Sequence, residues 1–133
     1  MENIFLYMPA EIKGAYIDKD VKFEGEKKIT VNIGTVIVGN VSIGEGSLIS
    51  FNCSISAREH EYIGHKNIRP RKMLEGKISI GKDVWIGMGV CILPNVIIET
   101  GAVIGAGSVV VKGTHIPKFE VWAGNPAIKI KER

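Results

Sequence analysis

The hydrophobic positions of this 133-residue chain return every six residues. A period of six is neither that of a helix, 3.6, nor that of a simple strand, 2. It predicts a short strand followed by a tight bend, repeated many times, with one large side chain pointing inward each time. From residue 80 onward the aliphatic positions are Ile80, Ile86, Ile92, Ile98, Ile104, Val110 and Ile116. Four residues after each of the first six stands a small or β-branched residue: Val84, Val90, Val96, Ala102, Ser108 and Thr114.

An earlier stretch repeats the pattern in the same register. Its aliphatic positions are Val31, Ile37, Ile43, Ile49 and Ile55, and their companions are Thr35, Val41, Ser47 and Cys53. A looser copy, two residues out of phase, covers Ile17, Phe23 and Ile29. Three such strands make a coil of about 18 residues, and stacked coils share parallel ladder hydrogen bonds. We therefore predict an all-β chain that folds as a single domain, residues 1–133, built as a three-sided parallel β-helix.

The repeat is interrupted once, at residues 57–77, which read AREHEYIGHKNIRPRKMLEGK. Both flanks are regular, so the pattern predicts a loop that protrudes from one corner of the helix. A loop of this length in a compact domain is usually functional or disordered. It carries two of the three histidines, His60 and His65. The position of His60 is the better fixed of the two, because it directly follows an ordered repeat.

Composition adds a modest net charge of +3 that is unevenly distributed. Cations gather in the segment 66–72 and in the last five residues, either as solvated surface or as the site of an anionic ligand. Basic and aromatic residues do not interleave, so we expect no nucleic acid partner. No apolar run reaches the roughly 18 residues of a membrane span, and the first residues lack the features of a secretory leader. Two cysteines suit free thiols in a reducing compartment, so we expect a cytoplasmic protein.

Four segments resemble the hexapeptide-repeat acyltransferases, in the branch of the maltose and galactoside O-acetyltransferases. They are the stretch from Ile43 to His60, VWIG at 84–87, VIGAGSVVVK at 103–112 and AGNPA at 123–127. The resemblance implies a left-handed coil, an exception to the right-handed crossover rule. It also implies that His60 is the general base that takes the proton from an acceptor hydroxyl attacking acetyl-CoA. Imidazole suits this role near neutral pH. Glu59, Glu61 or a backbone carbonyl would orient the ring, and a backbone N–H would meet the oxyanion.

The same resemblance implies a homotrimer with acetyl-CoA between subunits and no metal. Transfer would be direct within a ternary complex, because the sequence shows no Ser-His-Asp or Cys-His nucleophile arrangement. Cys53, at an inward position, and Cys91, beside one, are expected to be packing residues. The coenzyme-binding residues implied are Trp85, Gly105, Ala106, Lys112, Lys129 and Lys131. Trp122 is expected either to stack on adenine or to cover the last coil.

The acceptor pocket implied by the resemblance includes Asn32, and the loop residues Tyr62, Arg69 and Arg71 are expected to shape it. The sugar enzymes carry an acidic residue a few positions after Asn32, where this chain has Ile37 and Val38. That difference favours an acceptor from surface-polysaccharide or related sugar biosynthesis over maltose or a galactoside.

Three other functions remain open at the level of sequence. An amine on a nucleotide-linked sugar would be acetylated by the same coenzyme chemistry. A γ-carbonic anhydrase shares the predicted fold and has a His-x-x-x-x-His pair, the spacing of His60 and His65, but its third histidine would have to precede His60. Catalytic zinc takes three protein ligands, and no histidine precedes His60 here. A non-catalytic scaffold would need only the repeat.

Overall fold

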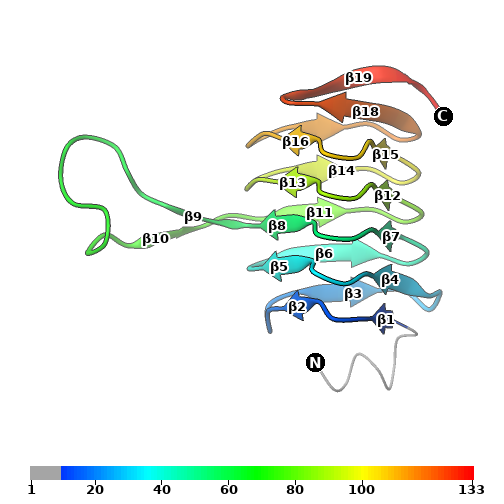
Figure 1. The fold of residues 1–133 in the computed structure, drawn as a ribbon, viewed down its shortest axis with the longest axis horizontal. Coiled ribbons are helices and arrows are strands. Elements are labelled where there is room, and N and C mark those ends of the chain that lie inside the picture. Colours follow the sequence, from blue (N-terminus) through cyan, green and yellow to red (C-terminus); the bar gives the residue numbers. More distant parts are fainter. Residues whose placement is uncertain (1–9) are drawn as a thin grey trace.

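The computed structural model describes residues 10–133. The sequence-based expectation about the first residues of the chain concerns residues 1–9, which lie outside the described part. The described chain is a three-sided stack of parallel strands with one long arm (Figure 1). Sheet A contains β1 (Ala10–Ile12), β4 (Ile29–Val31), β7 (Leu48–Ile49), β12 (Trp85–Ile86), β15 (Val103–Ile104), β18 (Glu120–Gly124) and β19 (Ala127–Glu132). Sheet B contains β2 (Tyr16–Ile17), β5 (Val36–Val38), β8 (Ser54–Ser56), β13 (Cys91–Ile92) and β16 (Val109–Val110). Sheet C contains β3 (Lys22–Glu24), β6 (Val41–Gly44), β11 (Ile78–Ile80), β14 (Ile97–Ile98) and β17 (His115–Ile116).

The core is the row of inward aliphatic residues that the period of six predicts. Every aliphatic position from Ile17 to Ile116 in the three copies of the pattern is buried. Ile80 pairs with Ile98 and Ile98 with Ile116, so equivalent positions of successive coils stack in the register that the repeat predicts. Burying a side chain of this size contributes about 1.5–3 kcal/mol, so these residues together supply a large favourable contribution to the free energy of folding.

Hydroxyl groups at the companion positions connect one coil to the next inside the corners. Ser47 is fully buried; its Oγ donates to the Gly81 carbonyl, 2.9 Å away, and accepts from the Val84 amide at 3.1 Å. Thr35 makes the equivalent pair of contacts, with its hydroxyl donating to the Ser50 carbonyl and accepting from the Cys53 amide. These hydroxyls satisfy backbone groups that a purely aliphatic corner would leave unpaired.

The phase shift in the first copy of the repeat has a local cause. Phe23 pairs with Ile43 and Val31 pairs with Ile49. The sequence separation is larger for the first pair than for the second, so this coil contains additional residues between Phe23 and Val31. The additional length widens the corner between β3 and β4. The Glu45 carboxylate accepts hydrogen bonds from the amides of residues 26 and 27 there, which holds the widened corner in place. The Lys27 amide is the main reason that the pKa of Glu45 lies below its usual value.

The interruption of the repeat is a protruding arm, residues 57–77, as predicted (Figure 1). Ile43 pairs directly with Ile80, so the whole arm is inserted within one coil and the next coil stacks on it as usual. The base of the arm is an antiparallel hairpin of β9 (Arg58–His60) and β10 (Met73–Glu75), in which His60 lies opposite Met73. The sequence predicts the arm but not this pairing.

The last coil is covered by the antiparallel pair β18 and β19. Trp122 is partly buried against the core and its indole N–H donates to Glu120 at 2.9 Å. The sequence predicts that Trp122 either stacks on adenine or covers the last coil. Its packing corresponds to the second of these roles. Within residues 10–133 no helix is long and apolar enough to cross a membrane.

Candidate functional site

His60 ends strand β9 on the outward-running half of the arm and is exposed. It borders two hollows. One, of about 430 Å³, is lined by His60, Ile68 and Arg69. The other, of about 180 Å³, places His60 beside Tyr62 and Lys112 and is completed by Glu59, Glu61, Ile63 and Leu74. The structure thus brings together His60, Tyr62, Arg69 and Lys112, which the sequence analysis selected separately.

The base of the arm is held against the helix by Arg58, two residues before His60. Its guanidinium donates to Asp18 Oδ2 at 2.8 Å and to Asp20 Oδ2 at 2.7 Å, both in the turn after β2. It also donates to the two carboxylate oxygens of Glu75 on β10, each at 3.0 Å. One side chain therefore connects β9, β10 and the body of the helix. Residues 18 and 58 are 40 positions apart in sequence, so the repeat pattern gives no signal of this contact.

The outer part of the arm is organised around Arg71. Its guanidinium donates to Glu61 Oε2 at 2.8 Å and to the carbonyls of residues 63, 66 and 67 at 2.7, 2.9 and 3.2 Å. The side chain is only 12% exposed. The sequence predicts that Arg71 shapes the acceptor pocket. Because its donors are already occupied, these contacts allow it to do so only through the backbone of the loop.

The carboxylates expected to orient His60 are engaged elsewhere. Glu59 accepts from Lys112 Nζ at 2.9 Å, and Glu61 is paired with Arg71. Among residues 10–133 the His60 ring makes no hydrogen bond. Lys112, expected beside the phosphates of a coenzyme, lies within reach of the loop that carries His60.

A second group of predicted residues lies on the outer face of sheet A. Trp85 stands between Leu48 and Val103 in adjacent strands, is 53% exposed and donates its indole N–H to Ser50 Oγ at 3.3 Å. The row continues through Val121, whose antiparallel neighbour on β19 is Lys131. This face is therefore an exposed apolar strip that ends in a cation.

The remaining predicted residues have local contacts within the coils. Gly105 donates its amide to the Trp122 carbonyl and accepts from Ser108 Oγ, and a Cβ there would lie 2.9 Å from the Ala123 side chain. Ala106 is exposed next to it. The Asn32 side-chain amide donates to the Ile49 carbonyl at 3.3 Å. Lys129 pairs with Glu132 and Glu120, which raise its pKa, in that order.

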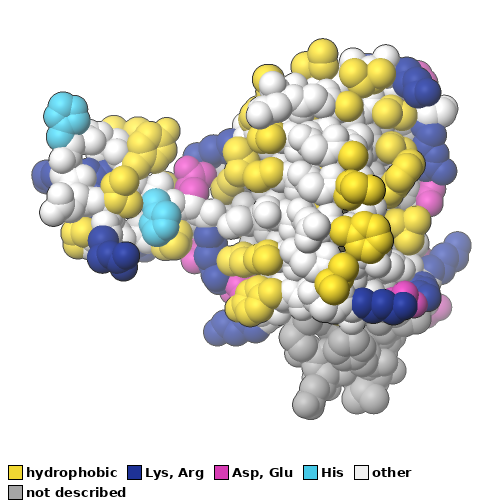
Figure 2. Space-filling model, in the orientation of Figure 1, with side chains coloured by type: hydrophobic (Ala, Val, Ile, Leu, Met, Phe, Trp, Pro, Cys, Tyr) yellow, Lys and Arg dark blue, Asp and Glu magenta, His cyan; other side chains and the backbone are white. Residues whose placement is uncertain are grey.

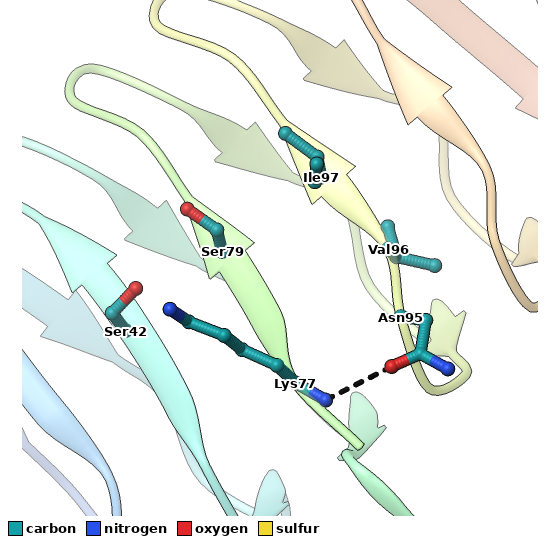
Figure 3. A pocket seen from close by; sticks show the side chains of 6 residues that line it. All are labelled: Ser42, Lys77, Ser79, Asn95, Val96 and Ile97. Carbon is teal, nitrogen blue, oxygen red and sulfur yellow. Dashed lines mark hydrogen bonds between the residues drawn. The ribbon is translucent and has the colours of Figure 1, made fainter.

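A third hollow, not anticipated from sequence, lies on the outer face of sheet C close to the base of the arm. It has a volume of about 440 Å³. Figure 3 shows the Lys77 side chain extending along this face toward Ser42 and Ser79, which are neighbours in adjacent strands. The Lys77 amide donates to Asn95 Oδ1 at 3.2 Å. The signal available in the sequence is that Lys77 is the last residue before the repeat resumes.

The predicted site residues fall into two groups on one chain. The first, on the arm and at the adjoining corner between sheets B and C, contains His60, Tyr62, Arg69, Arg71 and Lys112. The second, on sheet A and its corner with sheet B, contains Asn32, Trp85, Gly105, Ala106, Lys129 and Lys131. The arm projects well clear of the helix body (Figures 1 and 2), so a single chain does not bring the two groups together. Within the described part of the chain, no three His, Cys, Asp or Glu side chains are grouped as metal ligands.

Comparison with known proteins gives a consistent set of similarities. Residues 77–112 match the family model "Bacterial transferase hexapeptide (six repeats)". The chain is 35% identical to galactoside O-acetyltransferase of Escherichia coli K12 over 90% of its own length and 62% of that protein. It is 32% identical to a solved galactoside acetyltransferase in complex with coenzyme A, with a TM-score of 0.73, covering 98% of this chain and 68% of that one.

Another relative belongs to a different enzyme class. Mitochondrial γ carbonic anhydrase 2 of Arabidopsis thaliana is 28% identical over 94% of this chain and 50% of that protein. The chain spans 50% to 62% of the length of the first curated relatives that it matches.

Proposed function

Because this chain belongs to the hexapeptide-repeat acyltransferases, in the branch of the galactoside and maltose O-acetyltransferases, we propose that it transfers an acetyl group from acetyl-CoA to a hydroxyl of a saccharide. The observation that carries the proposal is the placement of His60. It stands exposed between two hollows on an arm that Arg58 fixes to the helix. We also propose that the protein acts in surface-polysaccharide biosynthesis and that it is located in the cytoplasm.

His60 acts as the general base in this proposal. An exposed imidazole at the edge of a hollow can accept the proton of an acceptor hydroxyl bound there, which makes the oxygen nucleophilic as it attacks the thioester carbonyl. Neither neighbouring carboxylate holds the ring, so we infer that the bound acceptor or a backbone carbonyl of another subunit orients it.

The exposed strip on sheet A suits the coenzyme, which supplies the activated acetyl thioester. Trp85 and Val103 offer apolar surface to a pantetheine arm, and Lys131 offers a cation to phosphate. Ala106 leaves its corner open, and Lys112 supplies a second cation beside the base. Lys129 contributes less, because two carboxylates already surround it.

The two groups of residues meet only if a second copy of the chain faces the first. We therefore propose a homotrimer in which the arm of one subunit brings His60 to the sheet A face of its neighbour. Exposed apolar side chains on and beside sheet B support such packing: Tyr16, Ile33, Val36, Phe51 and Met88. Transfer then takes place directly between two substrates held by different subunits.

Replacing His60 with alanine tests the proposal. A general base typically contributes about 10²–10⁴-fold, so kcat for acetyl transfer should fall by that factor while coenzyme A binding is unchanged. His65→Ala, which removes the other histidine of the arm, is the matched control and should keep wild-type turnover. Coenzyme A release is followed with a thiol reagent over a panel of hydroxyl and amino sugars. A His60→Ala variant with wild-type turnover refutes the role of His60, and a preference for amino sugars replaces the O-acetyl reaction with an N-acetyl one.

The similarity to γ carbonic anhydrase supports a second candidate, zinc-dependent hydration of carbon dioxide. Metal analysis of the purified protein and a hydration assay test it. Stoichiometric zinc together with hydration activity would establish that function in place of acetyl transfer.

A further inference from the structure

The charges of the arm leave it with unpaired cations and no unpaired carboxylate. Between residues 58 and 75 there are five Lys or Arg and three Glu. Each of the three glutamates is paired: Glu75 with Arg58, Glu61 with Arg71, and Glu59 with Lys112 from outside the arm. No carboxylate of residues 10–133 lies within ion-pair distance of Lys66, Arg69 or Lys72.

Arg69 is the cation without a carboxylate partner that shares a hollow with the candidate base. It lines the 430 Å³ hollow with His60 and Ile68, and its side chain is exposed. The two other arginines of the arm are held by carboxylates and, for Arg71, by backbone carbonyls, whereas the Arg69 guanidinium makes no hydrogen bond within the described chain. A guanidinium is suited to two parallel hydrogen bonds with a carboxylate or a phosphate.

Figure 2 shows that the arm, with its dark-blue cations, stands clear of the helix body and is open to solvent. At its base Lys77 adds a further cation beside the hydroxyls of Ser42 and Ser79 (Figure 3). Residues 60–73 of the arm carry four Lys or Arg and one Glu, so the side chains around Arg69 are net positive, and Lys77 adds a cation on the neighbouring face of sheet C. The carboxylates of Asp18 and Asp20 lie with Arg58 at the helix body. Charge of one sign around an open site attracts ligands of the opposite sign.

We infer that the acceptor is an anionic saccharide, with a carboxylate or phosphate that Arg69 binds while an adjacent hydroxyl faces His60. This inference rests on the proposed function and narrows its substrate class. Ile68 provides an apolar side to the same hollow, against which the C–H face of a sugar ring packs. Arg69 is a specificity-determining residue: it selects the charged acceptor and takes no part in the proton transfer.

Binding measurements on the intact chain test the inference without requiring acetyl transfer. The probes are methyl glucoside, methyl glucuronide and glucose 6-phosphate, with the galactose series in parallel, titrated calorimetrically at low ionic strength. We expect the uronate or the phosphate to bind at least about tenfold more tightly than the neutral sugar, which is a gain of about 1.4 kcal/mol. The advantage should shrink in 0.5 M salt, where screening is stronger. Comparison of the uronate with the phosphate identifies which anion the site takes.

Substitutions assign the effect to Arg69. Arg69→Gln should remove the preference, Arg69→Lys should keep part of it, and Lys118→Gln, an equal loss of charge at an exposed corner between β17 and β18, should leave it unchanged. Uronate and phosphate probes that bind no better than the neutral sugars overturn the inference. A loss of coenzyme A affinity in Arg69→Gln, with sugar binding intact, also overturns it, because the cation then serves the coenzyme. If the anionic sugars bind selectively but none is acetylated, the proposed function is wrong and the anion site stands.

Discussion

The buried hydroxyl of Ser47 offers a direct measure of what the corner contacts contribute to this fold. Ser47→Ala removes one oxygen from a fully buried position and leaves the Gly81 carbonyl and the Val84 amide without their partner. A buried polar group left unpaired costs about 1–3 kcal/mol, so the two together predict a loss of about 2–6 kcal/mol in the free energy of unfolding. For a chain of this size that corresponds to a fall in Tm of roughly 6–30 °C.

The assay is denaturant unfolding followed by circular dichroism, with all variants at the same protein concentration because subunit association adds to apparent stability. Ser42→Ala is the matched control. Its hydroxyl lies on the outer face of β6 and makes no hydrogen bond within the described residues, so we expect a change of less than about 0.5 kcal/mol. If Ser47→Ala is as stable as Ser42→Ala, the corner hydroxyls do not hold the coils together and the reasoning is wrong.

Three further predictions concern the thiols, the carboxylates and the base of the arm. Burial raises the pKa of Cys53, so a thiol reagent should label Cys91 first under native conditions, as peptide mass spectrometry will show; prior labelling of Cys53 contradicts its burial. Backbone amides lower the pKa values of Asp18 and Glu45, so the two carboxylates stabilise the fold above their ordinary pKa values of 3.8 and 4.5. They lose that contribution as the pH falls through the lowered pKa values. The Tm should therefore drop below about pH 4.5, and it should drop less steeply in an Asp18→Asn, Glu45→Gln double variant. Arg58→Met should accelerate amide hydrogen exchange in residues 58–75 but not in the coils, and equal acceleration everywhere would show that Arg58 stabilises the whole chain and not the arm.

The sequence predicts the helix body well because its regularity is local. Each inward aliphatic residue, from Ile80 to Ile116, is buried where the period of six places it, and the limits of the arm follow from where the period stops. The antiparallel pairing of β9 with β10 could not be predicted, because residues 73–75 carry no strand pattern and pair only once the chain has turned back on itself.

The environment of His60 was predicted less completely than its position. Glu59 and Glu61 are the nearest carboxylates in sequence, yet each is paired with a cation from a distant residue, Lys112 or Arg71. Arg58 meets Asp18 only because stacking of the coils brings the turn after β2 below the base of the arm. Contacts of this kind depend on which coils and loops lie next to each other in space. The residue types of a linear repeat do not give that information.

The closure of the arm at its base has a consequence for how such proteins diversify. The Gly76 amide donates to the Ala57 carbonyl at 2.7 Å, so the two ends of the insertion lie together and the ladder resumes in register at β11. An insertion at this corner whose ends meet in the same way is therefore compatible with the pairing of β11 with β6. The acceptor recognition that we propose for the arm would then change by exchange of this one insertion, independently of the proposed coenzyme face.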